Sequence, residues 1–138
     1  MKKTTIFISA VSAFVLATTL FGYFQFFGPI SVNLKSENIE RIGFIHPEGG
    51  EEYETFYIDP IEKEPLLEEL RDIKFRKTFL KCRCMGDAFV VIEYQDESKV
   101  KFDGFYLKKT DTQGKVTSYA LRRFDHVVAQ LYQDYMIE

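Results

Sequence analysis

The most constraining feature of the sequence is the stretch from Thr4 to Leu34, which contains no charged residue. Its centre, residues 6–30, is rich in Phe, Ile, Val and Leu. A helix over residues 6–27 would be about 33 Å long, and the hydrocarbon core of a bilayer is about 30 Å thick. Pro29 is expected to end that helix at Gly28, because proline disfavours helical geometry at the preceding residue. The stretch therefore predicts a membrane-spanning helix over residues 6–27.

Two other interpretations of this stretch stay open. A cleaved secretory signal has an apolar core of about 7–15 residues, followed by small residues at the cleavage site. Here the apolar stretch is longer, and Phe26 and Phe27 stand where small residues would be needed, so an uncleaved anchor is favoured over secretion after cleavage. A buried core helix is the third interpretation, and it is disfavoured because a domain this small could hardly cover it.

Lys2 and Lys3 predict the orientation of the anchor. Basic residues on a short flank favour the cytoplasmic side of the membrane, which places the chain from about Val32 onward on the other side. We therefore expect a short cytoplasmic start and signal-anchor over residues 1–31, a polar tether over 32–38, and an extracytoplasmic domain over 39–138. The expected location is the cell membrane, crossed once.

The charges of the remaining chain exclude one class of partner. Removing Lys2 and Lys3 from the 18 basic residues leaves 16, against 21 acidic residues, which gives a net charge of −5 with His neutral. The two signs are interspersed along the chain without a basic stripe, so nucleic acid is not an expected partner. The roughly 105 residues after the anchor suffice for one domain with its own core.

Alternation of apolar residues predicts most of the strands. The run over residues 88–95 is almost continuously apolar, so we expect it in the middle of a sheet with both faces covered. Residues 75–84 read as extended but are poorly patterned. Further strands are expected at residues 39–46, 53–58, 100–106 and 116–122, with turns at 47–50 and 111–114.

Two helices are expected after the anchor. Asp59 and Pro60 signal the first, with Asp59 as a side-chain cap, but Pro65 would clash inside a running helix. We therefore expect a separate first turn, then a main helix to about Asp72. The second helix has apolar residues at three- and four-residue steps from Phe124 to Met136. The predicted fold is α+β: an N-terminal transmembrane helix, then an antiparallel sheet of five or six strands with two helices packed on one face.

Cys82 and Cys84 are the strongest candidates for chemistry. In an extended strand their Cα atoms would lie about 7 Å apart, near the upper limit for a disulfide. Structural zinc usually has two to four residues between its cysteines, whereas only Arg83 stands here. The default interpretation is a pair of buried or half-buried thiols; a disulfide, or a metal or redox site that also uses His46, are the alternatives.

The other polar candidates have weaker support. His46 and His126 could each act as a general base, but neither has a nucleophile motif nearby, so ordinary surface histidines are the default. An acidic cluster surrounds the first turn, and a solvated hairpin tip is favoured over a cation site. No cofactor-binding motif is found and no cofactor is expected. The residues of that cluster are Glu48, Glu51, Glu52 and Glu54.

Five tyrosines fall within the predicted strands. If several of them share the sheet face opposite the helices, they would form an amphipathic patch for a protein or glycan partner. Burial in the core is the favoured alternative. These partner-binding candidates are Tyr53, Tyr57, Tyr94, Tyr106 and Tyr119.

Taken together, the sequence predicts a membrane-anchored extracytoplasmic binding or accessory domain without catalysis. Its partners would be the membrane, through residues 6–27, and a protein of the cell envelope. One alternative is an immunity or inhibitor protein that neutralises a toxin at the cell surface. Another is a small metal or redox module that uses Cys82 and Cys84, and a third is a positioning role for the anchor helix.

Overall fold

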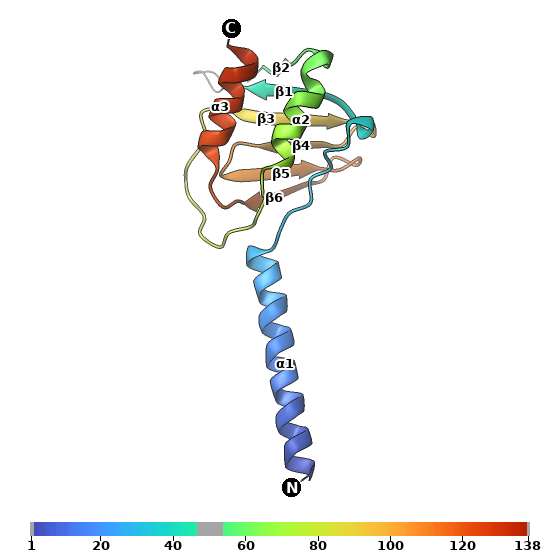
Figure 1. Cartoon of the computed structure of the whole chain (residues 1–138), viewed down its shortest axis with the longest axis vertical. Coiled ribbons are helices and arrows are strands. Elements are labelled where there is room, and N and C mark those ends of the chain that lie inside the picture. The colour runs from blue at the N-terminus through green and yellow to red at the C-terminus, as the bar shows by residue number, and fades with distance from the viewer. Residues whose placement is uncertain (1, 47–53, 138) are drawn as a thin grey trace.

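The computed structural model describes residues 2–46 and 54–137. A long N-terminal helix, α1 (Lys2–Phe27), projects from a domain built of a six-stranded antiparallel sheet and two further helices (Figure 1). The predicted α+β fold is confirmed, with six strands rather than five. The predicted turn at 47–50 and Tyr53 lie outside the described residues.

The strands lie in the order β2-β1-β3-β4-β5-β6, and each neighbouring pair is antiparallel. The apolar run expected at the middle of a sheet forms β3, between β1 and β4. The strands are β1 (Ile39–Ile45), β2 (Phe56–Tyr57), β3 (Phe89–Tyr94), β4 (Lys99–Phe102), β5 (Tyr106–Thr110) and β6 (Val116–Ala120).

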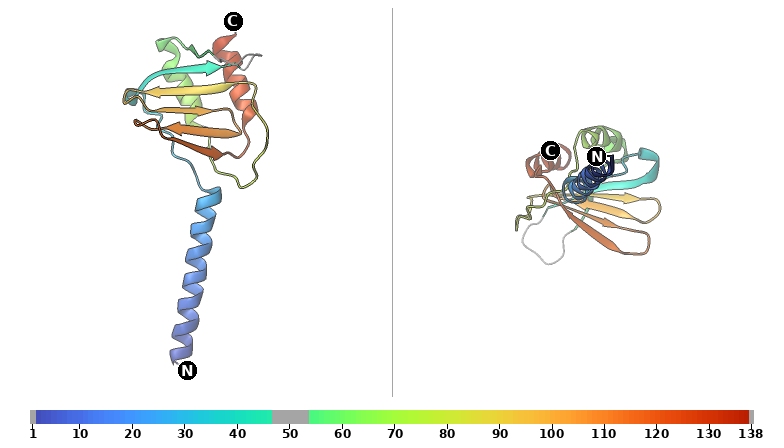
Figure 2. Two further views of the ribbon diagram at one scale, coloured as in Figure 1. Left: turned by 180° about the vertical axis from the view of Figure 1, so that it is seen from behind. Right: turned by 90° about the horizontal axis from the view of Figure 1, so that it is seen from below.

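The register of the strands separates the two faces of the sheet, because residues directly opposite each other point to the same side. Helices α2 (Lys63–Arg71) and α3 (Asp125–Met136) cover one face, as the view from behind shows (Figure 2). Leu66, Leu67 and Leu70 of α2 are fully buried against it. One largely apolar row on the covered face crosses all six strands: Phe56, Phe44, Val90, Phe102, Leu107 and Tyr119.

The start of the first domain helix confirms one prediction and corrects another. A 3-10 turn, η2 (Pro60–Glu62), precedes α2, and Pro65 lies in the first turn of α2, where proline removes no helical hydrogen bond. The predicted side-chain cap by Asp59 is wrong. Instead, the Asp59 carbonyl accepts a hydrogen bond from the Glu62 amide at 2.9 Å, which closes the 3-10 turn through the backbone.

Residues 75–84 do not form the extended strand that we expected. Only Arg76 and Lys77 form bridges, to Pro29 and Leu121 respectively. The Lys77 amide donates to the Gly28 carbonyl at 3.0 Å, and the Arg122 amide donates to the Arg76 carbonyl at 2.8 Å. This short piece therefore lies between the end of α1 and the end of β6, and the chain then leaves the sheet as a loop over residues 79–87.

The segment predicted to be a tether lies along the domain. Ile30 is buried in the core, and Val32 and Leu34 pack against it. The Tyr94 hydroxyl donates to the Asn33 carbonyl at 2.8 Å, and the Lys109 ammonium donates to the Ser31 carbonyl. A 3-10 turn, η1 (Ser36–Asn38), then leads directly into β1.

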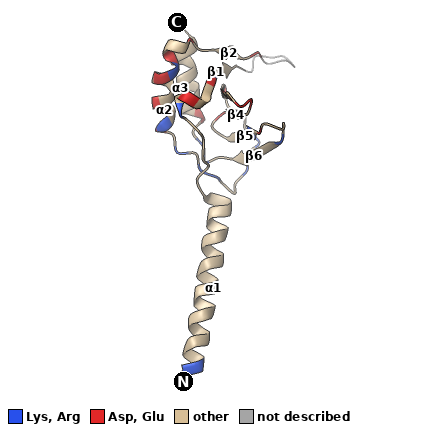
Figure 3. Ribbon diagram, turned by 90° about the vertical axis from the view of Figure 1, so that its right-hand side faces the viewer, with Lys and Arg blue, Asp and Glu red and all other residues tan. Residues whose placement is uncertain are grey.

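Helix α1 is 26 residues long, and none of them is buried by the rest of the molecule. Its length and composition suffice to cross a membrane, a property that signal sequences share. Apart from the basic residues at its N-terminal end, the helix carries no charge (Figure 3). The Ser12 and Thr19 hydroxyls donate to the carbonyls of Ile8 and Val15, at 2.9 and 2.8 Å, so these polar groups are satisfied within the helix.

Candidate functional site

Cys82 and Cys84 are joined by a disulfide, with their Cα atoms 5.1 Å apart. The default prediction of buried or half-buried free thiols is therefore wrong, and the disulfide alternative is the one observed: the described chain has no free cysteine. Cys82 is exposed and Cys84 is half-buried. The physical reason is the shape of the backbone. Residues 79–87 form a loop, and a bend between the two cysteines brings their Cα atoms closer than the ~7 Å of an extended strand.

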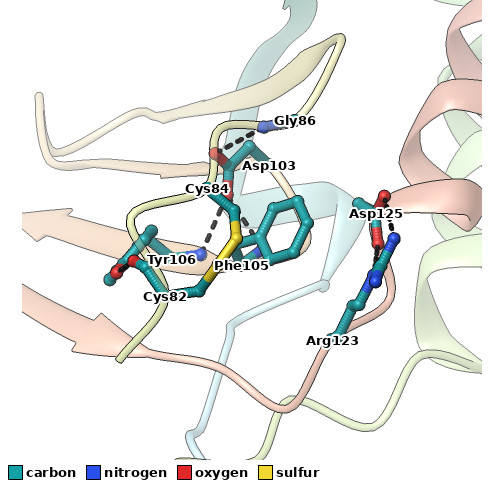
Figure 4. A network of polar contacts seen from close by, with 8 residues as sticks. All are labelled: Cys82, Cys84, Gly86, Asp103, Phe105, Tyr106, Arg123 and Asp125. Atoms are coloured by element: carbon teal, nitrogen blue, oxygen red, sulfur yellow. Dashed lines mark hydrogen bonds and ion pairs between the residues drawn. A yellow bond between two sulfur atoms is a disulfide. The ribbon is translucent and has the colours of Figure 1, made fainter. Parts of the chain in front are cut away.

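Asp103 fastens this loop to the sheet. Its side chain is buried, and its carboxylate accepts hydrogen bonds from the amides of Gly86 at 3.2 Å, Phe105 at 2.9 Å and Tyr106 at 2.8 Å (Figure 4). The Tyr106 hydroxyl also donates to the Cys82 carbonyl. A Cβ at Gly86 would lie 2.5 Å from the Asp103 carbonyl oxygen, so the close approach requires glycine.

Sequence reasoning missed the role of Asp103. The available signal was local: an Asp followed by Gly directly after a strand often bonds its own backbone in a turn. The bond to Gly86, in contrast, joins residues 17 positions apart and has no sequence pattern.

The sheet face opposite the helices, which we call the open face, is not covered by any helix that the structure describes (Figure 2). Its central row crosses the whole sheet. The row consists of Tyr57, Gly43, Val91, Lys101, Lys108 and Ser118.

Two lysines stand side by side on the open face. Lys101 stands directly opposite Lys108, and like charges in that position repel. The Lys101 ammonium lies 4.5 Å from the centre of the Phe89 ring. Burial, and secondly the charge of Lys108, lower the pKa of Lys101. A cavity of about 330 Å³ beside this pair is also lined by Tyr106 and Cys84, so the disulfide loop forms one of its walls.

A second polar group on the open face links three strands. The Glu93 carboxylate accepts hydrogen bonds from Arg41 at 2.5 Å and from the Tyr57 hydroxyl at 3.0 Å. The Arg41 guanidinium also lies 4.0 Å from the centre of the Tyr57 ring. Burial acts to raise the pKa of Glu93, but the bonds from Arg41 and Tyr57 together hold it below its ordinary value.

The structure divides the tyrosine candidates instead of gathering them. Tyr57 and Tyr106 are on the open face, whereas Tyr94 and Tyr119 are on the covered side, where they line a cleft of about 630 Å³ beside residues 31–38. Burial raises the pKa of Tyr94 to about 12. Tyr53 lies outside the described residues.

The histidine and acidic candidates are not brought to this site. His46 is half-buried, with its ring 5.1 Å from that of Tyr132, and His126 is exposed in the first turn of α3. Among residues 2–46 and 54–137, no group of three or more His, Cys, Asp or Glu side chains is placed to hold a metal ion. Glu54 is exposed; Glu48, Glu51 and Glu52 lie outside the described residues.

The fold and the open face define an α+β domain that follows a long apolar helix. Comparison with protein families, with characterised proteins and with solved structures finds no match to this chain.

Proposed function

We propose that this protein is a single-pass membrane protein whose C-terminal domain lies outside the cytoplasm and binds a protein partner without catalysis. The partner-binding surface is the open face. The observation that carries the proposal is the pairing of Lys101 with Lys108 on an uncovered face, beside the Phe89 ring. A negatively charged partner surface would relieve the repulsion between the two lysines.

Two features support the location. Helix α1 leaves its large apolar side chains exposed, and each of them favours insertion into a bilayer by roughly 0.3–0.6 kcal/mol near the centre. Disulfides persist in oxidising compartments, which include the outer side of the cell membrane, and the bridge between Cys82 and Cys84 fits such a location.

The chemistry of the open face indicates the kind of partner. Arg41 and Lys101 are both close to aromatic rings, and Tyr57 adds an exposed aromatic side chain. Arg and Tyr are enriched where protein interfaces concentrate their binding energy. The partner surface should therefore offer carboxylates against Lys101 and Lys108, and an apolar group against the rings.

The orientation is tested by reporters fused after Glu138. A reporter enzyme that is active only outside the cytoplasm should be active at this position, and one that is active only in the cytosol should be inactive. The reverse result would overturn the outward orientation.

The binding surface is tested by a photo-activated cross-linking side chain at Lys108 in the full chain, in living cells. The control position is Glu68, which is exposed on α2 on the other side of the sheet. We expect a defined cross-linked product from position 108 and none from position 68. A Lys101→Glu substitution should reduce its yield, and equal yields from both positions would contradict the proposal. A toxin as the captured protein would identify the immunity variant of this function.

A redox role for the disulfide is the second candidate function. The observation that favours it is the exposure of Cys82 beside the cavity that Cys84 lines, because exposed disulfides are the ones that thiols reduce readily. A Cys84→Ser variant can be compared with a deletion of the gene in living cells. If the variant keeps cross-linking at position 108 but behaves like the deletion, the redox role is favoured. Loss of both would indicate that the bridge only shapes the binding surface.

A further inference from the structure

The loop that follows α2 lies at the end of the domain from which α1 emerges (Figure 1). Its position results from the pairing of residues 75–77 with residues 28–30. The Ile30 amide donates to the Phe75 carbonyl at 2.8 Å, and the Lys77 amide donates to the Gly28 carbonyl at 3.0 Å. The Phe79 ring is 5.9 Å from the ring of Phe26, which belongs to α1 itself. The start of the loop is therefore fixed at the height where the apolar helix ends.

The first two residues of this loop are apolar and exposed. Phe79 is 65% exposed and Leu80 is 81% exposed. Each would be more stable with its side chain out of water, since burial of a large apolar side chain is favourable. No described element of the domain covers either side chain.

Basic residues flank Phe79 and Leu80 along the chain. The ten positions from Lys74 to Arg83 include five basic residues and no acidic one. Lys74, Arg76 and Arg122 line a common cavity of about 640 Å³, which Glu69 and Asp72 also line. Arg123 lines it as well, but its guanidinium is already bonded to Asp125 at 2.6 Å. We call this set the basal surface: Lys74, Arg76, Phe79, Leu80, Lys81 and Arg122.

We propose that the basal surface docks on anionic phospholipid in the membrane that holds α1, with Phe79 and Leu80 in the interface and the basic side chains on the headgroups. The inference rests on the proposed anchoring by α1, but not on which side of the membrane the domain lies. Apolar side chains flanked by several Lys and Arg are the combination that binds anionic membrane surfaces.

The position of the basal surface favours the membrane over a protein partner as its ligand. The backbone bonds at Gly28 and Ile30 place the basal surface within a few residues of the end of α1. A bilayer around α1 would lie next to Phe26, and therefore next to Phe79. The surface would then be in contact with lipid headgroups without any movement of the domain.

The chain contains no tryptophan, which makes a single reporter possible. We would place Phe79→Trp in the full chain, reconstituted in vesicles of phosphatidylglycerol and phosphatidylcholine with brominated acyl chains. The expected result is blue-shifted emission that the brominated lipid quenches. The control is Ile61→Trp, at an 83% exposed position near the start of α2, which should stay red-shifted and unquenched.

The charge requirement is tested by Lys74→Glu/Lys81→Glu in the Phe79→Trp background. Each basic residue near an anionic surface changes the docking equilibrium about fivefold, so we expect a loss of about 25-fold or more. A matched variant, Lys99→Glu/Lys108→Glu, makes the same change of charge on the open face and should keep the quenching. High salt should also weaken docking, because it screens surface charges.

Three results would overturn the proposal. The Phe79→Trp reporter could stay in water while the chain floats with the vesicles, which would leave the anchoring by α1 intact and remove only the docking. Equal quenching in vesicles of phosphatidylcholine alone would remove the role of anionic lipid. A chain that does not float with vesicles would overturn the docking and the proposed anchoring together.

Discussion

At the scale of single residues, two carboxylates join segments that are distant in the sequence. Asp103 binds the amide of Gly86 and so holds the disulfide loop on the sheet. Glu93 binds Arg41 from β1 and Tyr57 from β2. A carboxylate can accept several hydrogen bonds at once, which is why Glu93 can connect three strands and Asp103 can connect the disulfide loop to the turn between β4 and β5.

Replacement of Glu93 by Gln should make stability less dependent on pH. The pKa of Glu93 is lower in the folded protein than its ordinary 4.5, so its ionised form stabilises the fold above that pH, and the contribution disappears as the pH falls through the folded value. At neutral pH the variant should lose less than about 1 kcal/mol of unfolding free energy, because the pair is partly solvated.

Urea unfolding of both proteins in detergent micelles, at neutral pH and again well below the ordinary carboxylate pKa, measures this difference. Glu68→Gln, an exposed position on α2, is the control and should change little. If the unfolding free energies of Glu93→Gln and the parent differ by the same amount at both pH values, the ion-pair explanation is contradicted.

At the scale of elements, the position of α3 depends on Gly104, in the connection between β4 and β5. The Phe124 amide donates to the Gly104 carbonyl at 2.9 Å, just before α3 begins. Gly104 has a φ of +91°, a region that favours glycine, and a Cβ there would lie 2.4 Å from the backbone of Asp125. The helix therefore packs directly on a bare backbone.

Gly104→Ala should be much more destabilising than Gly114→Ala. Gly114 also has a positive φ, of +82°, but a Cβ there meets nothing within 4 Å. We expect about 1 kcal/mol for Gly114→Ala from backbone strain alone, and at least about 2 kcal/mol more for Gly104→Ala, because α3 must move. Urea midpoints measure both values, and equal losses would show that α3 does not depend on this contact.

The disulfide loop is an element whose stability has several sources. Cys82 and Cys84 are only two positions apart, so their bridge closes a very short loop. Asp103 and Tyr106 hold the same loop by hydrogen bonds that do not involve the sulfur atoms. Reduction should therefore loosen the wall of the open-face cavity and leave the sheet folded.

A reductant should lower the unfolding free energy by only about 1–2 kcal/mol, as expected for the entropy of closing such a short loop. A Cys82→Ser/Cys84→Ser variant should show the same loss and should not respond further to reductant. Thermal unfolding with and without reductant measures the effect. Global unfolding on reduction would show that the bridge holds the domain together.

At the scale of the whole molecule, the junction between α1 and the domain is structured. Residues 28–30 pair with residues 75–77, and this pair continues through Arg76 and Arg122 to the end of β6. A free tether would let the domain rotate about the anchor. The observed bonds instead give the domain one orientation relative to α1, which is the basis for the proposed docking of the basal surface.

Hydrogen exchange should reveal this junction. The amides of Ile30 and Lys77 are bonded to backbone carbonyls, so in the full chain they should exchange more than about tenfold more slowly than the rate for an unstructured peptide. Exchange at the unstructured rate would show that residues 28–30 are a flexible linker, and the fixed orientation would then be wrong.

The sequence predicted the elements that depend on local pattern. Apolar periodicity located β3, the Leu66–Leu70 stripe of α2 and the whole of α3, because the spacing of apolar residues follows directly from the period of a helix or strand. It did not predict the path of residues 75–84, since their backbone hydrogen bonds go to residues such as Gly28, Ala120 and Arg122, all more than 30 positions away along the chain.

The candidate site shows the same division. The sequence identified Cys82 and Cys84 as a notable pair, but a bend in the backbone decided that they are bridged. Tyr57 and Tyr94 could not be distinguished as strand tyrosines from the sequence. The strand register places Tyr57 on the open face, whereas Tyr94 lies on the covered side and donates to the Asn33 carbonyl.

By itself, then, the sequence determined that a long apolar helix precedes an α+β domain with an apolar core, because the composition and period of each segment determine its secondary structure and its apolar face. The tertiary structure alone decided which lysines face each other and which carboxylate holds the disulfide loop. It also decided that Arg76 and Lys77 lie beside the end of α1. Those facts depend on strand register and on contacts between distant residues, and no local pattern encodes either of them.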